Sequence, residues 1–368
     1  MKAKTKSNLS NIFGSLFSNR RAVEAGKTLP WWMALISFLL AVFIPIIPIM
    51  VQTANSYGSQ FISSTTYGLE TSLTASTLDL YNNGYEFKID EDHKLIAYKD
   101  SALYTPTIEA DKTAITRYVN STTGMIDLEI YYSVRGSEGE NNLSSLLDII
   151  KGKTYISNTA TEGSASTTSE TSDSEEETVT YYRPSYVILY KEGIYACLMK
   201  PNSTTAASSS GGNWKHHEIG SSLLKDLLVV KDGDNEILPT SDTRDNLLKN
   251  GTYVDGVFSN WKASFDLSYL TAKSNSLTTS TLVFLGIYIL LSFFMGLMLF
   301  LLTRGKKNPF RYLSFFTCQK INAWSSFCPA LLALILGFII PNYAVMFFIA
   351  LLGLRTMWLS MKQLRPQY

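Results

Sequence analysis

The sequence predicts an integral membrane α-helical protein with four spans, one followed by three, and a mixed α+β extracytoplasmic domain between the first two. Two uncharged apolar runs, 31–51 and 281–303, are each long enough for a helix to cross about 30 Å of hydrocarbon. Two shorter runs, 324–340 and 343–361, are separated by a Pro-Asn pair, a turn signal that predicts a helical hairpin. Segregated charge and strand-like patterns are the other two observations behind this fold class.

The charges of this 368-residue chain are separated along its length, although they sum to only +1. Residues 52–276 carry 18 Lys and Arg against 30 Asp and Glu, whereas the remainder carries 14 Lys and Arg and one acid, Glu24. The two parts therefore have net charges of −12 and +13. Because basic flanks of spans remain in the cytoplasm, we expect both termini there, residues 52–276 outside the cell, and the spans in the cell membrane. So small a net charge does not predict a nucleic-acid partner.

These observations divide the chain into segments. The first apolar run is too long for a signal-peptide core, and no small-x-small cleavage pattern follows it, so we expect an uncleaved anchor. The predicted segments are a cytoplasmic basic segment with an amphipathic helix (1–29), a first span (30–51), the extracytoplasmic domain (52–276) with a disordered acidic insert (157–180), a second span (279–303), a cytoplasmic amphipathic segment (304–323), a third span (324–340), a fourth span (343–361) and a cytoplasmic tail (362–368).

An amphipathic helix is predicted before the first span. Its apolar residues follow the i, i+3, i+4, i+7, i+8 spacing of one helix face: Leu9, Ile12, Phe13, Leu16 and Phe17. With basic residues at both ends, such a helix can lie among the headgroups of the lipid bilayer. A docking helix for a cytoplasmic partner is the alternative.

The segment between the second and third spans is also basic and amphipathic. Pro309 suits a helix start, after which Phe310, Leu313, Phe316 and Thr317 would share one face. This segment is predicted either to lie on the headgroups or to press against an ATPase subunit. The candidate residues for that partner contact are Pro309, Phe310, Arg311, Phe316 and Lys320.

Ionisable residues are scarce within the predicted spans. None contains Asp, Glu or His, which argues against an ion-driven transporter. Arg355 interrupts the fourth run, and we expect its long side chain to reach inward to the interface.

The outer block reads as mixed α+β. Alternating apolar residues predict one hairpin from 85–89 and 94–98 and another from 185–190 and 194–200, together with a half-buried strand over 125–134. Helical spacing predicts helices over 142–151, 218–230 and 243–249. The Ser/Gly-rich composition of residues 202–212 predicts a loop there.

No catalytic or metal-binding motif stands out. The acidic turn 90–93 matches no ligand set, and the sequence from Asp232 to Glu236 lacks the glycine and final glutamate of a calcium loop. His216 and His217 are adjacent and would point to opposite faces of a strand. We therefore expect no enzyme, metal or cofactor. The many outer tyrosines favour strand packing, with stacking on an oligosaccharide ligand as the alternative.

The layout resembles the maltodextrin-utilisation membrane protein family of Gram-positive bacteria. The likeness lies in the stretch NPFRYLSFFTCQKINAWSSFCPALLALILGFIIPN, with Pro309, Trp324, Pro329 and Pro341 as landmarks, and is specific to the last 65 or so residues. It implies an accessory membrane protein of maltose/maltodextrin ABC import, with permease or ATPase subunits as partners. The layout is also similar to mechanotransmission ABC permeases, whose outer domain relays to a cytoplasmic ATPase. A membrane receptor with an outer sensor domain is the remaining alternative.

Overall fold

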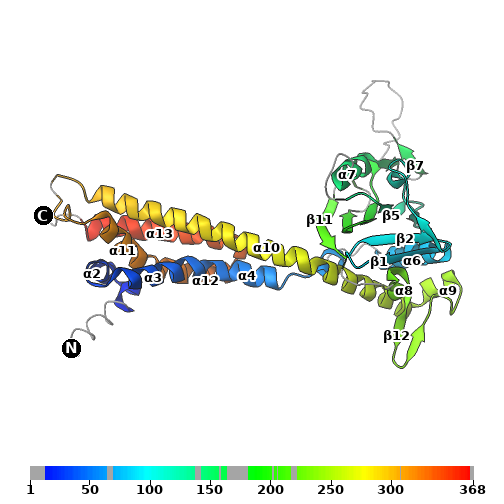
Figure 1. Ribbon diagram of the computed structural model, residues 1–368, viewed down its shortest axis with the longest axis horizontal. Helices are drawn as coiled ribbons and strands as arrows, with labels where there is room; N and C mark the ends of the chain where they lie inside the picture. Colours follow the sequence, from blue (N-terminus) through cyan, green and yellow to red (C-terminus); the bar gives the residue numbers. More distant parts are fainter. Residues whose placement is uncertain are drawn as a thin grey trace, which may run out of the picture. The chain divides into compact units, whose positions relative to one another are not determined.

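A computed structural model of the chain describes residues 13–63, 69–136, 142–156, 159–163, 181–200, 203–204, 206–216, 222–306 and 308–364. The chain divides into two compact units (Figure 1). The helical unit contains residues 1–56 and 273–368, and the mixed unit contains residues 57–272.

The helical unit contains the apolar runs. Its elements are α2 (Asn19–Thr28), α3 (Trp31–Phe43), η1 (Ile44–Ile46), α4 (Ile47–Ala54), the second part of α10 (Gly251–Leu302), α11 (Phe315–Ser325), α12 (Phe327–Ile339), η3 (Pro341–Tyr343) and α13 (Ala344–Lys362). In the described part of the chain, four helices are long and apolar enough to cross a membrane: Trp31–Ala54, Gly251–Leu302, Phe315–Ile339 and Ala344–Lys362. The predicted spans therefore correspond to helices of the required length and composition.

Two details of these helices follow from prolines. Pro45 and Pro48 each lack an N–H donor, and the first long helix passes through the 3₁₀ turn η1 at this point. Pro341 opens the η3 turn, after which α13 packs back along α12. The predicted helical hairpin is therefore confirmed.

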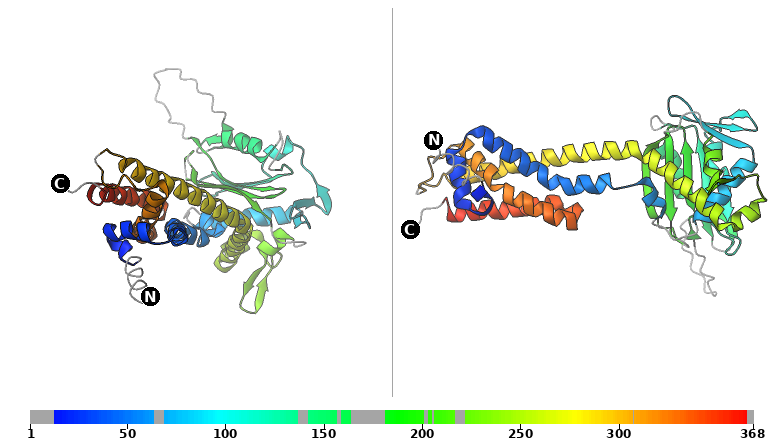
Figure 2. Two further views of the ribbon diagram at one scale, coloured as in Figure 1. Left: turned by 60° about the vertical axis from the view of Figure 1, so that its left-hand side comes forward. Right: turned by 90° about the horizontal axis from the view of Figure 1, so that it is seen from below.

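The mixed unit is built on a five-stranded sheet (Figure 2). Its strand order is β11 (Ala206–Lys215), β10 (Gly193–Met199), β9 (Ser185–Tyr190), β5 (Ile126–Ser133) and β4 (Thr116–Val119). β5 and β9 are parallel, and the other neighbours are antiparallel. The predicted hairpin of β9 and β10 is confirmed.

Helices cover both faces of this sheet. Leu128, Ile130 and Tyr132 of β5 face the larger core, formed with α6 (Leu69–Asn82), α8 (Leu223–Leu228) and the first part of α10. Tyr131 points to the other face, under α7 (Leu143–Gly152). The prediction that residues 125–134 form a half-buried strand is therefore wrong about burial: β5 is an inner strand with a helix on each face.

Smaller elements complete the unit. They are α5 (Gly58–Ser63), α9 (Arg244–Lys249), the sheet of β1 (Tyr85–Ile89), β2 (Leu95–Lys99) and β3 (Ala102–Tyr104), the sheet of β6 (Thr154–Ile156), β7 (Thr159–Gly163) and β8 (Tyr181–Tyr182), and the hairpin of β12 (Val230–Asp232) and β13 (Asn235–Ile237). The predicted first hairpin and the helices at α7 and α9 are confirmed, whereas α8 is shorter than predicted.

Two predicted loops are partly strand. Residues 206–215 pair with β10, and residues 159–163 pair with β6. The cause is that each lies beside an open strand edge, where backbone pairing satisfies N–H and C=O groups whatever the side chains. The rest of the acidic insert, 157–158 and 164–180, lies outside the described residues.

Candidate functional site

The link between α10 and α11 holds most of the predicted partner contact. α11 begins at Phe315, where the Ser314 side chain accepts a hydrogen bond from the Thr317 N–H at 3.2 Å. The predicted helix start at Pro309 is therefore wrong. Asn308 Oδ1 accepts from the Phe310 N–H at 2.9 Å, which forms a local turn that competes with a helix.

This correction also changes the third long helix. It begins at Phe315, so residues 315–323 of the predicted cytoplasmic segment 304–323 belong to the same long apolar stretch of helix as the predicted third span. The expected common face of Phe310, Leu313 and Phe316 does not exist, because the first two precede the helix. Leu313 is buried instead.

The five predicted contact residues have three different environments. Pro309, Arg311 and Phe316 are exposed, and Phe316 is 78% exposed. Phe310 is half-buried, and Lys320 is half-buried beside an apolar groove. The sequence reasoning missed Tyr312, which is 71% exposed and could have been found as an aromatic next to a basic residue in a predicted loop. We call the exposed set, Pro309, Arg311, Tyr312 and Phe316, the α10–α11 surface.

Lys27 of α2 contacts two aromatic residues of the link between α10 and α11. Lys27 Nζ lies 4.8 Å from the centre of the Phe310 ring and donates a hydrogen bond to Tyr312 Oη at 3.1 Å. Such a cation–π contact at an exposed site contributes about 0.5–1 kcal/mol. Phe310 is therefore joined to α2 through this contact with Lys27.

The predicted amphipathic helix is described only in part. Leu9 and Ile12 lie outside the described residues, whereas residues 13–17 are helical. Phe13 and Phe17 are exposed, and Leu16 lines an apolar groove of about 270 Å³ with Trp32 and other residues of α3 and α12.

The helix that follows, α2, was missed by the sequence reasoning. It packs against α11 through small side chains, and a Cβ added at Gly26 would lie 2.9 Å from the Ile321 Cα. The signal that could have identified this contact is the spacing Ala22-x-x-x-Gly26, since small residues four apart allow helices to approach closely.

Arg355 joins three elements of the helical unit. Its Nη1 donates to the Ser325 carbonyl at 2.8 Å, its Nε donates to Asn19 Oδ1 at 3.0 Å, and its Nη2 donates to the Ser15 carbonyl. All three of these donors are therefore used by protein acceptors, and two of the acceptors belong to the segment 1–29 that was predicted to be cytoplasmic.

Pro329 explains why the Ser325 carbonyl needs this donor. In a regular helix, the N–H of residue 329 would bond the carbonyl of residue 325, but proline has no N–H. The chain breaks between α11 and α12 at Ser326 for the same reason. Arg355 supplies the missing donor from a different helix.

The mixed unit has a polar cavity of about 200 Å³ beside β5, β8 and β9. Its lining includes Asn120, Asp127, Tyr182, Arg183 and Lys200. Asn120 Nδ2 donates to Asp127 Oδ2 at 2.9 Å, yet burial is the larger effect and raises the pKa of the Asp127 carboxyl. Carboxyl, amide and guanidinium groups of this kind suit a polar ligand with several hydroxyls.

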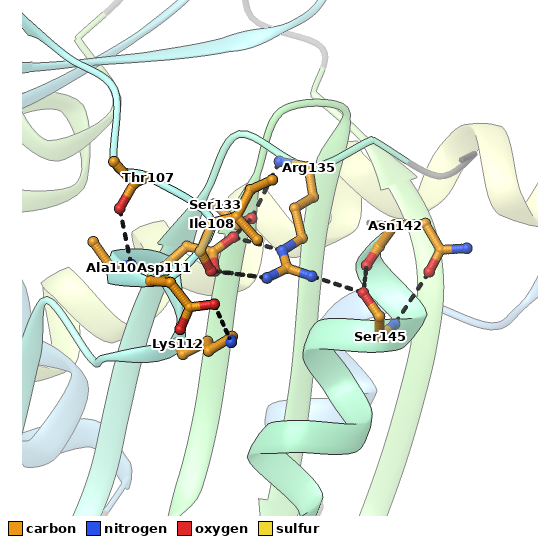
Figure 3. Close-up of polar contacts among 10 residues, drawn as sticks. Thr107, Ile108, Ala110, Asp111, Lys112, Ser133, Arg135, Asn142 and Ser145 are labelled. Carbon is orange, nitrogen blue, oxygen red and sulfur yellow. Dashed lines mark hydrogen bonds and ion pairs between the residues drawn. The ribbon is translucent and has the colours of Figure 1, made fainter. Parts of the chain in front are cut away.

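Buried charges of β5 and the segment after it are fully paired. Arg135 forms two hydrogen bonds to Asp111, at 2.6 and 3.0 Å, and donates to Ser145 Oγ at 2.7 Å (Figure 3). Ser133 Oγ also donates to Asp111 at 2.7 Å. This network fastens β5 to α7 and uses the donors and acceptors that a ligand would need.

A second buried carboxylate lies on the same strand. Glu129 accepts hydrogen bonds from Tyr131 Oη at 2.7 Å and Tyr155 Oη at 2.8 Å, and it forms a salt bridge with Arg117 at 2.8 Å. Burial, and then the Glu129 charge, raise the pKa of Tyr131. These partners hold Glu129 in place and leave it no exposed edge at which to bind substrate.

The remaining histidine, cysteine and acidic side chains considered in the sequence form no metal site within the part of the chain that the structure describes. Among the described residues, no three His, Cys, Asp or Glu side chains come together as metal ligands. His216 is buried and its Nε2 lies 3.0 Å from the Tyr190 carbonyl, whereas His217 lies outside the described residues. Burial raises the pKa of the Cys197 thiol, so a reactive thiolate is disfavoured.

Comparison with known proteins does not assign the chain to a family. No family model, curated protein or solved structure matches the chain.

Proposed function

We propose that this chain is an integral protein of the cell membrane, with both termini in the cytoplasm and residues 52–276 outside, and a non-catalytic accessory subunit of maltose/maltodextrin ABC import. The four long apolar helices and the opposite charges of the two parts support membrane insertion in this orientation. The resemblance of the last 65 or so residues supports the link to maltodextrin import.

The observation that carries the accessory role is the α10–α11 surface. Two large rings, Tyr312 and Phe316, and the side chain of Arg311 are all exposed in the short segment 311–316, on what would be the cytoplasmic side. Aromatic and arginine side chains dominate the binding energy of many protein interfaces. This surface suits a permease or ATPase subunit that offers an apolar pocket with an acidic rim.

Affinity purification from native membranes tests the proposal. The wild type should co-purify with transporter subunits, and a variant with Arg311→Ala and Phe316→Ala should lose most of them. Tyr343→Ala is the matched control, since Tyr343 is an exposed ring of the η3 turn. Deletion of the protein should impair growth on maltodextrin. Unchanged growth would refute the accessory role, and co-purification that survives the double substitution would refute the assignment of the surface.

The polar cavity is the place for an oligosaccharide ligand in this proposal. Calorimetric titration of maltotriose should give binding for the wild type and at least tenfold weaker binding for Asp127→Ala. Equal binding by the two proteins would remove the ligand from this cavity.

A mechanotransmission permease subunit is the second candidate, favoured by α10. This single helix has residues 251–272 in the mixed unit and residues 273–302 in the helical unit. Ser276→Pro would break it at an exposed position, with Ser276→Ala as control. The mechanotransmission role predicts loss of coupled ATPase activity with subunit binding retained, whereas the accessory role predicts no change in either.

A further inference from the structure

We propose that the helical unit binds one anionic phospholipid in the groove between α3, α10 and α11, with Lys320 at its phosphate. The groove has a volume of about 380 Å³ and an almost entirely apolar lining. Its walls include Trp31 and Leu35 of α3, Phe293 of α10 and Phe316 of α11. This site rests on the membrane insertion proposed above; it shares Phe316 with the α10–α11 surface, but its test changes Lys320 and Leu35, which are not part of that surface.

Lys320 is the one charged side chain of the groove lining. It is half-buried, and no salt bridge joins it to a carboxylate within the described residues. The other polar lining residue, Gln319, is already used, since its Nε2 donates to the Phe293 carbonyl at 3.0 Å. Lys320 therefore presents an ammonium group to the groove without a protein anion beside it.

The composition of the helical unit explains why no protein anion is present. Glu24 is the only Asp or Glu in residues 1–56 and 273–368, and it lies 3.3 Å from Arg20. Among its described residues, the helical unit therefore offers Lys320 no carboxylate, and in our proposal a bound anion supplies the opposite charge. The phosphate of an anionic lipid supplies it at the depth where lysine side chains meet headgroups.

The groove also has its charged and apolar ends in the order expected of a lipid site. Trp31 opens α3 and Lys320 lies in the second turn of α11, so both lie near the ends of their helices that would face the cytoplasm. Phe38 lies seven residues further along α3, roughly 10 Å deeper at 1.5 Å per residue. A headgroup at the Lys320 end therefore places its acyl chain along apolar walls.

Native mass spectrometry of the full chain tests this site. The protein is purified with equal amounts of phosphatidylglycerol and phosphatidylcholine, and the ratio of retained lipids is measured. The wild type should retain one phosphatidylglycerol in preference, Lys320→Met should reduce the preference about fivefold, and Lys320→Arg should retain it. Lys306→Met is the matched control, because Lys306 is an exposed cation outside the groove lining.

A second variant separates the groove from the charge. Leu35→Trp fills the groove while leaving Lys320 in place, and it should lower retention of the bound lipid. The proposal is overturned if Lys320→Met keeps the preference, if Lys306→Met loses as much of it, or if Leu35→Trp has no effect. Resistance to alkaline carbonate extraction tests membrane insertion by itself, so failure of insertion and failure of the lipid site remain distinguishable.

Discussion

Arg355 and Pro329 should behave as an energetically coupled pair. Arg355→Met removes the donor to the Ser325 carbonyl and to the Ser15 carbonyl, and both of these serines are buried. A buried carbonyl without a donor costs about 1–3 kcal/mol. Polar contacts inside membrane bundles average only about 0.6 kcal/mol, and removing the half-buried Arg355 cation recovers part of its desolvation cost. Both effects reduce the loss, so we expect the free energy of unfolding to fall by about 1 kcal/mol.

Pro329→Ala should reduce this loss. The substitution restores an N–H that can bond the Ser325 carbonyl, because Ser326 already has helical dihedral angles, φ −72° and ψ −22°. The double variant should then be more stable than the sum of the single effects by about 1 kcal/mol. The free energy of unfolding of all four proteins can be measured by SDS titration in mixed micelles. Pro45→Ala, a proline of η1, serves as the control and should be additive with Arg355→Met.

The outcome that refutes this reasoning is simple additivity of Arg355→Met and Pro329→Ala. In that case the Ser325 carbonyl would not be the acceptor that makes Arg355 necessary. Coupling of equal size with Pro45→Ala would point to a general loosening of the bundle instead.

Three further predictions concern other parts of the chain. Gly26→Ala should destabilise the helical unit by about 1–3 kcal/mol in the same assay, because the new Cβ would meet the Ile321 backbone, whereas Gly286→Ala meets no neighbouring atom and should be neutral. Asn142→Ala should lower the thermal stability of the mixed unit by about 1 kcal/mol, because the Asn142 side chain caps α7. Burial raises the folded-state pKa of Asp127, so its contribution to stability falls as pH rises from about 3.9 through that raised value. Asp127→Asn should abolish this slope in pH-dependent thermal melts, and an unchanged slope would contradict the assignment.

Periodicity was sufficient to predict the local elements. The β1–β2 and β9–β10 hairpins and the α12–α13 hairpin each combine a strong repeat with a short turn, so neighbouring residues determine them. Burial of β5 could not be predicted in this way. Its second face is covered by α7, and its polar residues Ser133 and Glu129 bond Asp111 and Tyr155, which are distant in sequence.

The structure of the candidate site was harder to predict, because it depends on side-chain turns and contacts that helix periodicity does not show. Pro309 was predicted to begin a helix from local preference, but the side chains of Asn308 and Ser314 provide a turn and a later cap. The contact of Gly26 with Ile321 joins residues almost three hundred positions apart. No local pattern contains that information.

The basic residues of the helical unit show how this affects function. Counted along the sequence, those outside 52–276 are equivalent contributors to a net charge of +13. In the structure, Lys27 lies over an aromatic ring, Arg355 bonds carbonyls inside the bundle, and Lys320 faces an apolar groove. Arg311 remains exposed, in the same short segment as the exposed rings Tyr312 and Phe316. A charge substitution that weakens binding of a cytoplasmic subunit should therefore be found at Arg311, whereas the same change at Lys320 should alter lipid retention and leave that binding intact.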